Sequence, residues 1–499
     1  MALSPHQLQK SGVVGVLGSL ALSAVRPGVS TLPLRAVRWL QDLEKLGIRL
    51  PFFLVHDIGL LSAVPHGMLA LGPRVSVAAL GPTAPGTAHM LEAYERLVNE
   101  LSECEGLRRA SHLRLSDGMI VVVLSKLLGS VAQRVTARAG YTCELFADAA
   151  LFEGLDNELG GLFARLDRSF ELQSVSVLVR ARLYVLTVAD ALDLDTLRLV
   201  GVLGAEGNVA GALQVDLLSA MASPAAHDVV NFSLEILPSV LETKTRPGAS
   251  TRAGFGCEGM GNKGSVDNLV LTELAWDTED FARRALDNEL LYYTKETERE
   301  PAGRRHVLLI DASASMRGDR QVFARGMALA TAKKLVLEGE DVAIRFFDAR
   351  LYEPHRARGG NLPTPHVLAF TGERGRNPRR VFADLVTTLD IEQDSDHREV
   401  VLHVFTHAAL YIPRELVQAV KRRAKVGVVF ILPSGDSLDL DYLDLLDAHW
   451  VVDHDTLAEQ SARANKARDI LGQIGARDET EPAARHRPSM TGQAGSSQL

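Results

Sequence analysis

Residues 301–460 alternate short apolar runs with longer segments that mix alanine, leucine and charged residues. Apolar runs of about four to eight residues are typical of buried strands, and longer segments with three-to-four spacing are typical of helices. Strands that alternate with helices predict an α/β fold with a doubly wound, mostly parallel sheet. The predicted strands are residues 306–310, 341–347, 399–405, 426–432 and 450–452, and the predicted helices are residues 321–337, 379–389, 413–423 and 438–446.

The preceding part of the chain predicts a largely α-helical N-terminal region. Residues 1–150 are mixed and mostly helical in pattern. Within them, residues 119–124 are either a strand or the first half of a helix that continues through Leu128 and Val131. Residues 151–245 carry leucine and alanine at helical spacing and predict a second helical region.

Two further segments differ from these regions in composition. Residues 246–300 predict a glycine-rich linker followed by a lead-in helix, which begins at Asp277 or Thr278 and ends near Tyr293. Residues 473–499 are polar and contain proline, serine and glycine, so they predict a disordered tail. We therefore take residues 301–460 as the unit that carries the candidate site.

A carboxylate and two hydroxyls follow the first apolar run of that unit, namely Asp311, Ser313 and Ser315. They fall on the loop that leaves the carboxyl end of the predicted strand, which is where open α/β sheets bind ligands. Oxygen ligands of this kind suit Mg²⁺ better than zinc or copper. Ser and Asp side chains at a helix start also satisfy free N–H groups, so capping the next helix is an alternative and compatible role.

The pattern Asp311-x-Ser313-x-Ser315, followed by Met316, resembles the von Willebrand factor A (vWA) family over residues 301–455. In that family the pattern opens a metal-ion-dependent adhesion site. The family completes the site with a threonine from a later loop and an aspartate after a later strand. The resemblance therefore implies a metal site that recognises a protein partner.

This sequence departs from the family at both later positions. The resemblance implies that Thr371, or alternatively Asn377, supplies the later loop's ligand. At the aspartate position stand Thr406, which offers a hydroxyl, and His407, which is a poor ligand for Mg²⁺. With one carboxylate instead of two, the expected Mg²⁺ site is incomplete.

A second resemblance concerns the segment that leads into the predicted sheet. Residues 264–276 (Gly-Ser-Val-Asp-Asn-Leu-Val-Leu-Thr-Glu-Leu-Ala-Trp) and 289–293 (Glu-Leu-Leu-Tyr-Tyr) are similar to the lead-in of bacterial vWA proteins encoded with MoxR-type AAA+ ATPases, including ternary systems with an FtsH-type protease. This implies a non-enzymatic adaptor that presents a client protein to the ATPase, in protein remodelling or biological conflict. The alternative that vWA proteins imply is a chelatase-like subunit for metal-cofactor assembly, or a hydrolase that uses a metal at Asp311.

The sequence offers little for catalysis by the chain itself. The run Gly254-x-Gly256-x-x-Gly259 follows no predicted strand, and no Gly-Lys-Ser/Thr occurs in the glycine-rich stretch, so a phosphate loop is not indicated. The adjacent His56 and Asp57 are interpreted as loop polarity. The later histidines are interpreted as packed or surface residues: His397, His403, His407, His449 and His454.

Composition excludes several classes of protein. A net charge of −8 and an aromatic content of 5% argue against a nucleic-acid partner. The 3 cysteines form no Cys-x-x-Cys pair, which fits a reducing cytoplasm. No apolar run has the ~20 residues that a membrane span needs. Residues 12–25 are interpreted as a plain helical start, with a signal peptide as the alternative.

Overall fold

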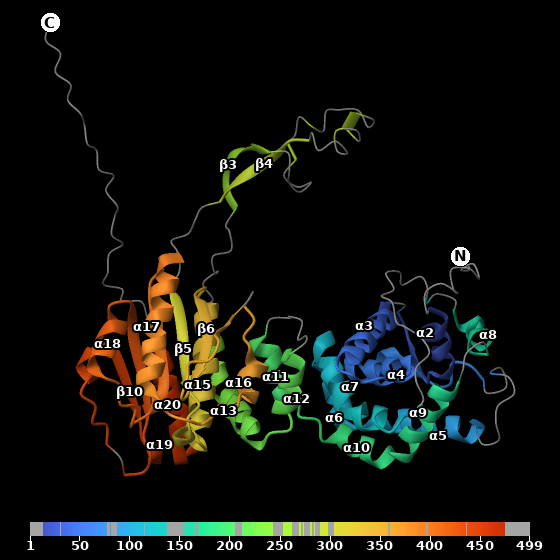
Figure 1. Ribbon diagram of the computed structural model, residues 1–499. Helices are drawn as coiled ribbons and strands as arrows, with labels where there is room; N and C mark the ends of the chain where they lie inside the picture. Colours follow the sequence, from blue (N-terminus) through green and yellow to red (C-terminus); the bar gives the residue numbers. More distant parts are fainter. Residues whose placement is uncertain are drawn as a thin grey trace, which may run out of the picture.

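The structure is a computed structural model of the chain (Figure 1). The residues that it describes are 13–29, 31–76, 80, 87–113, 115–136, 152, 155–164, 168–204, 212–242, 253–261, 269–270, 273, 280–281, 284, 290–297, 304–357, 360–395, 398–435 and 437–474.

A six-stranded sheet forms the centre of the C-terminal half within the described residues. Its strands are β5 (Arg305–Asp311), β6 (Asp341–Phe347), β7 (His355–Arg356), β8 (Val400–His407), β9 (Ala424–Ile431) and β10 (Ala448–Val452). Their order across the sheet is β10-β9-β8-β5-β6-β7, and all neighbours are parallel except β6 and β7. The prediction of a doubly wound, mostly parallel sheet after a helical region is confirmed.

The chain builds this sheet outward from β5 in both directions. It first adds β6 and β7 on one side, and then crosses over to add β8, β9 and β10 on the other. The carboxyl ends of β5 and β8 therefore lie side by side where the strand order reverses, which is the usual ligand position in open α/β sheets. β5 is buried along its whole length, which explains its continuous apolar run.

Helices cover both faces of the sheet (Figure 1). One face packs against α13 (Pro224–Leu241), α15 (Asp319–Leu337) and α20 (Gln460–Gln473), and the other packs against α17 (Pro378–Ser395) and α18 (Arg414–Lys421). Successive residues of β5 alternate between the two cores, with Leu308 and Ile310 in the first and Val307 and Leu309 in the second.

Helix α13 belongs to the sheet's core although it precedes the sheet by more than sixty residues in the sequence. Phe232 of α13 stacks on Phe323 of α15, with ring centroids 5.4 Å apart. A Cβ added at Gly326 would lie 2.4 Å from the Phe232 ring, so glycine is what allows the two helices to approach so closely. Pro238 lies inside α13 and does not end it.

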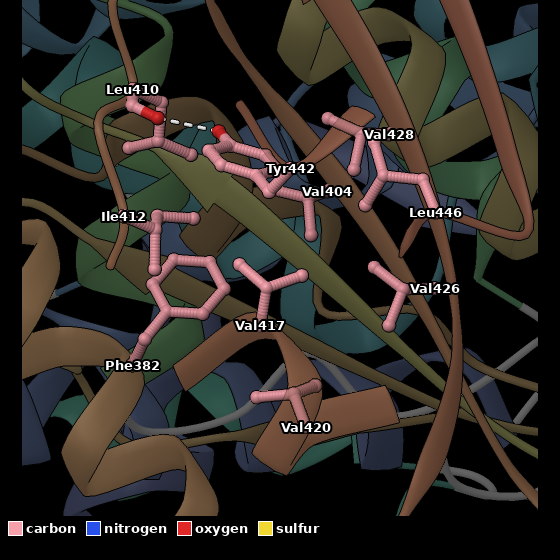
Figure 2. Close-up of a pocket in the computed structure, with 10 residues that line it drawn as sticks. All are labelled: Phe382, Val404, Leu410, Ile412, Val417, Val420, Val426, Val428, Tyr442 and Leu446. Atoms are coloured by element: carbon pink, nitrogen blue, oxygen red, sulfur yellow. Dashed lines mark hydrogen bonds between the residues drawn. The ribbon is translucent and has the colours of Figure 1, made fainter. Parts of the chain in front are cut away.

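The second face of the sheet contains a small apolar cavity (Figure 2). Its side chains come from β8, β9, α17 and α18 and from the segments that follow β8 and β9: Phe382, Val404, Leu410, Ile412, Val417, Val420, Val426, Val428, Tyr442 and Leu446. Tyr442 reaches into the cavity and donates its hydroxyl to the Leu410 carbonyl at 2.5 Å. The cavity has a volume of about 10 Å³, which is about what one water molecule occupies. It is a packing gap rather than a ligand site.

Two helices join the N-terminal core to the sheet's core. In α11 (Leu194–Leu203), Leu197 packs in the N-terminal core whereas Leu199 packs in the sheet's core. In α12 (Ala212–Ala220), Leu217 and Ala220 divide in the same way. The boundary between the two cores therefore runs through these helices, inside the region 151–245.

The N-terminal core consists mainly of helices. They are α2 (Val13–Ser19), α3 (Thr31–Lys45), α4 (Phe52–Ala63), α5 (Thr87–Glu103), α6 (Glu105–His112), α7 (Asp117–Ala132), α8 (Leu159–Phe163), α9 (Ser169–Arg180) and α10 (Arg182–Asp190). A short antiparallel pair of strands, β1 (Val25–Pro27) and β2 (Leu69–Leu71), accompanies them. Residues 119–124 lie in α7, so the helical alternative for this run is the right one.

The segment expected to be a glycine-rich linker contains a strand. Residues of β3 (Ala253–Gly261) pair antiparallel with β4 (Tyr292–Thr297), and the hairpin projects from the sheet domain in Figure 1. Tyr293 therefore lies in a strand and not at a helix end. Tyr and Thr favour strands, and antiparallel backbone pairing can include glycines because it uses main-chain groups only. Of the expected lead-in helix, Asp280, Phe281 and Arg284 are helical.

Two smaller differences concern the helices of the C-terminal half. The helix expected at residues 438–446 is reduced to one 3₁₀ turn, Leu443–Leu445. The structure adds α16 (Thr364–Ala369), α19 (His454–Ala458) and α20, which the sequence patterns did not predict. Of the expected disordered tail, residues 475–499 lie outside the described residues.

Among the described residues, no single helix has the length and apolar character to cross a membrane. Helices α9 and α10 meet that test only as a pair, and they are bent by 69° relative to each other.

Candidate functional site at the carboxyl edge of the sheet

Asp311 is the last residue of β5, and Thr406 and His407 are the last two residues of β8. The two strands are parallel neighbours, with Ile310 paired to Phe405. This pairing brings residues that are far apart in the sequence to one edge of the sheet. We call Asp311, Ser313, Thr406 and His407 the carboxyl-edge site.

The Asp311 carboxylate is buried and hydrogen-bonded through both oxygens. Its Oδ1 accepts the Ser313 backbone N–H at 2.8 Å, and its Oδ2 accepts the Thr406 hydroxyl at 2.7 Å. Asp311 is 3% exposed and Thr406 is 0% exposed. A carboxylate that accepts bonds from a backbone amide and a hydroxyl is held in one orientation. Thr406 was expected to offer its hydroxyl to a metal ion, and in the structure this hydroxyl donates to Asp311.

His407 lies beside the same carboxylate. Its Nε2 is 3.7 Å from Asp311 Oδ2, which is beyond hydrogen-bond distance. Its Nδ1 accepts the Ala409 backbone N–H at 3.0 Å, so the proton of the neutral ring is assigned to Nε2. Burial lowers the pKa of His407, and Arg376 and Arg320 act in the same direction, whereas Asp311 opposes them. The ring is therefore neutral near pH 7 and directs an N–H toward the site.

The two serines of the pattern differ in environment. Ser313 is 5% exposed, and its hydroxyl has no hydrogen-bond partner among the described residues. Ser315 is half-buried in the 3₁₀ turn Ala314–Met316 that follows. A buried hydroxyl without a partner is unusual in a folded protein and points to something that would complete it.

Neither Thr371 nor Asn377, the two candidates from the later loop, is hydrogen-bonded to Asp311 among the described residues. Asn377 is exposed, and its side chain accepts the Arg380 backbone N–H at 3.1 Å, which caps the start of α17. Thr371 is exposed as well. No hydrogen bond among the described residues links either one to Asp311 or Ser313. The sequence could not decide between Thr371 and Asn377, because the conformation of a loop depends on its tertiary contacts.

Asp348, which the sequence patterns did not single out, fixes the position of this loop. It follows β6 directly and is 2% exposed. Its Oδ2 accepts the Arg374 backbone N–H at 2.9 Å and the Tyr352 hydroxyl at 3.0 Å. Tyr352 in turn accepts the Glu373 backbone N–H at 3.0 Å. An acidic residue directly after an apolar strand was the available signal, since Asp311 follows β5's apolar run in the same way.

The loop of residues 371–376 passes directly over the Asp311 turn. A Cβ added at Gly372 would lie 2.6 Å from Asp348 Oδ2 and 3.3 Å from the Ala312 side chain, so only glycine fits there. Arg374 has a φ of 63°, and it alone among the described non-glycine residues has a positive φ. Such a conformation persists only when the surroundings enforce it, and here the bond to Asp348 does so.

The donor set does not fit Mg²⁺. A hard divalent cation favours several oxygen ligands and more than one carboxylate. Within the carboxyl-edge site Asp311 is the single carboxylate, both of its oxygens already accept hydrogen bonds, and the neighbouring His407 is a poor ligand for Mg²⁺. Arg320 and Arg376 add positive charge nearby. No group of three or more His, Cys, Asp or Glu residues in the described part of the chain is placed to hold a metal.

A second polar cluster lies in the N-terminal core around His56 and Asp57. The carboxylate accepts bonds from Ser23 Oγ at 2.5 Å, the Ala24 backbone N–H at 2.7 Å and the Tyr94 hydroxyl at 2.8 Å, and His56 Nδ1 lies 2.8 Å from it. Catalytic triads place the nucleophile on the Nε2 side of the ring. Ser23 is 3.4 Å from Nδ1 instead, and the cluster is fully buried. It is a structural network, not the loop polarity that the sequence indicated.

The later histidines do not join the carboxyl-edge site, except for His407. His449 and His454 are exposed, and His397 lies outside the described residues. His403 stacks on His306, with ring centroids 5.2 Å apart and a distance of 2.9 Å between His306 Nδ1 and His403 Nε2. Burial lowers the pKa of His306 to about 4 and that of His403 to about 3.

This buried pair predicts a loss of stability in mild acid. Because both folded-state pKa values lie below the ordinary value of about 6.5, the unfolded chain takes up protons that the folded chain does not as the pH falls. Each histidine then costs about 2 kcal/mol of stability between pH 7 and pH 5. In His403→Gln, urea unfolding should show a pH-dependent loss that is smaller by about 2 kcal/mol. Equal losses in both proteins would contradict this account, since His56 and His407 contribute alike to both.

No family model and no curated protein matches this chain. Among solved structures, it is similar to a von Willebrand factor type A protein from Catenulispora acidiphila, with 14% identity, a TM-score of 0.26, and coverage of 36% of this chain and 43% of that one. The chain thus spans less than half of that protein's length. It is also similar to the RO (RSR) protein of Deinococcus radiodurans, with 15% identity, a TM-score of 0.23, and coverage of 91% and 99%.

Proposed function

We propose that this protein is a non-enzymatic adaptor that recognises a protein partner at the carboxyl-edge site. The observation that carries the proposal is the character of the site. It lies at the switch point of the sheet and has buried polar atoms that are not satisfied. The two buried carboxylates there, Asp311 and Asp348, already accept hydrogen bonds from internal donors, and no described serine hydroxyl at the site is hydrogen-bonded to a base. Such a site can bind and orient a group but has little means of transforming it.

The sequence resemblance supplies the class of partner. The vWA-like pattern at Asp311 and the lead-in segment before the sheet both support an adaptor for a MoxR-type AAA+ ATPase, with a client protein as the second partner. In this proposal the ATPase performs the work. The N-terminal helices, which are linked to the sheet's core through α11 and α12, would bind the client or the ATPase.

Capture from native cells tests this function. Affinity-tagged full-length protein should retain an AAA+ ATPase, and the double variant Ser313→Ala/Thr406→Ala should retain at least about tenfold less, because that loss corresponds to only 1.4 kcal/mol of binding energy. The charge variant Lys421→Gln, at the opposite edge of the sheet, should retain as much as the wild type. Recovery of no ATPase, or equal recovery by the double variant, would count against the proposal. ATP hydrolysis by the purified chain would contradict its non-enzymatic character.

A further inference from the structure

Three unsatisfied polar atoms belong to the carboxyl-edge site or lie beside it. They are Ser313 Oγ, His407 Nε2 and Arg320 Nε, each buried and without a hydrogen-bond partner among the described residues. Arg320 stands in the first turn of α15 and is close enough to His407 to lower its pKa. The histidine and arginine atoms are N–H donors, and the serine hydroxyl can donate as well. A ligand that satisfied all three would have to be an acceptor.

Exposed arginines stand around these donors. Arg374 and Arg376 belong to the loop that passes over Ala312, and Arg317 follows the Ser313–Ser315 turn. None of the three has an ion-pair partner in the described part of the chain, whereas Arg350 is paired with Glu373 at 2.9 Å. Of the nearby acids, buried Asp311 and Asp348 already accept hydrogen bonds from internal donors, whereas Asp319 stands exposed in the first turn of α15. The exposed surface above the site therefore carries more cations than anions.

We propose that the carboxyl-edge site binds a side-chain carboxylate of an acidic partner segment directly, without a bridging metal ion. Ser313, Arg320 and His407 would donate to the carboxylate, and Arg317, Arg374 and Arg376 would pair with neighbouring acidic residues. In this arrangement the chain's own cations and donors hold the partner's carboxylate. This inference rests on one part of the proposed function, namely that the carboxyl-edge site binds a protein partner.

Two observations favour an acidic protein segment over a nucleic acid. The chain carries a net charge of −8, which opposes the long-range attraction of a polyanionic backbone. The three unsatisfied buried atoms can all act as donors, which suits a carboxylate acceptor. No aromatic side chain stands among the residues that form it, so a base would have nothing to stack on.

Fluorescence anisotropy with a labelled peptide of alternating glutamate and glycine tests the inference on the full-length protein. Binding should be equal in EDTA and in MgCl₂ and should weaken with salt. The variants Arg320→Gln and Arg376→Gln should each weaken binding about tenfold, and Ser313→Ala about fivefold. The peptide with glutamine in place of glutamate should bind at least about tenfold more weakly.

Matched controls separate this site from general charge. Lys421→Gln/Lys425→Gln removes two cations that pair with Asp447 and Glu399 at the opposite edge, and it should leave binding unchanged. Binding that requires Mg²⁺, or that resists Arg320→Gln and Arg376→Gln, would overturn the inference. So would tighter binding of a single-stranded oligouridylate at the same arginines. If the peptide binds as expected but no partner is captured from cells, the proposed function fails while this inference stands.

Discussion

Replacing Arg325 with methionine is expected to lower the free energy of unfolding by about 3–5 kcal/mol. Arg325 lies on α15, is 5% exposed, and donates to the backbone carbonyls of Val367 and Leu368 at 3.0 Å and of Phe370 at 2.7 Å. Burial lowers its pKa to about 10, so the guanidinium remains charged at neutral pH. It also lies over the Phe346 ring at 5.5 Å.

The expected loss follows from what Arg325 satisfies. The last carbonyls of a helix have no hydrogen-bond partner within the helix. At the end of α16, the Arg325 guanidinium donates to these carbonyls. Methionine would fill much of the space but would leave three buried carbonyls without a donor. Helix α16 also packs on α12, where His366 Nδ1 lies 3.3 Å from Asp216 Oδ2. The variant should therefore loosen the contact between the sheet and the linking helices.

Urea unfolding of three variants would measure this effect. Arg325→Lys keeps the charge but not the fork of donors, so it should fall between the wild type and Arg325→Met. Arg468→Met on the exposed surface of α20 should change stability by less than about 0.5 kcal/mol. A loss of under about 1 kcal/mol in Arg325→Met would show that the carbonyls find other partners.

Replacing Asp57 with alanine is expected to cost about 4 kcal/mol, because it leaves several buried donors without an acceptor. The carboxylate is 0% exposed and accepts from the Ser23 hydroxyl, the Ala24 backbone N–H and the Tyr94 hydroxyl, with His56 beside it. These bonds join α4 and α5 to the turn before β1. The N-terminal core should therefore lose cooperativity first.

A graded series tests this explanation by thermal and urea unfolding. Tyr94→Phe removes one donor and leaves the others in place, so it should cost only about 1 kcal/mol. Asp57→Asn should be intermediate, because an amide can accept at one atom but offers N–H groups at the other. Asp228→Ala, on the exposed side of α13, should be nearly neutral. Equal effects from Tyr94→Phe and Asp57→Ala would contradict a shared network.

Much of the sheet domain was predictable because its signals are local. The apolar run of β5 and the Ala- and Leu-rich segment of α15 depend on residues close in sequence, and both were located nearly to their ends. The hairpin of β3 and β4 was not predicted, since its strands are separated by about thirty residues and one of them is mostly glycine and small residues. Pairing between strands so far apart in the sequence produces no local pattern of apolar residues that identifies either strand.

The candidate site shows the same division. Sequence determined Asp311, Ser313 and Ser315, because the pattern and the strand before it are contiguous. It left Thr371 and Asn377 unresolved and did not identify Asp348, because the loop's path depends on a bond from Asp348 to the backbone of Arg374.

By itself, then, the sequence determined that a strand ends in an acid followed by two serines, within a doubly wound sheet. Only the tertiary structure decided which side chains surround Asp311. The crossover that sets β8 beside β5 brings Thr406 and His407 to Asp311, and the loop held by Asp348 brings arginines over it. The physical reason is that ligand chemistry depends on which donors and charges meet in space, and those meetings span about a hundred residues of sequence.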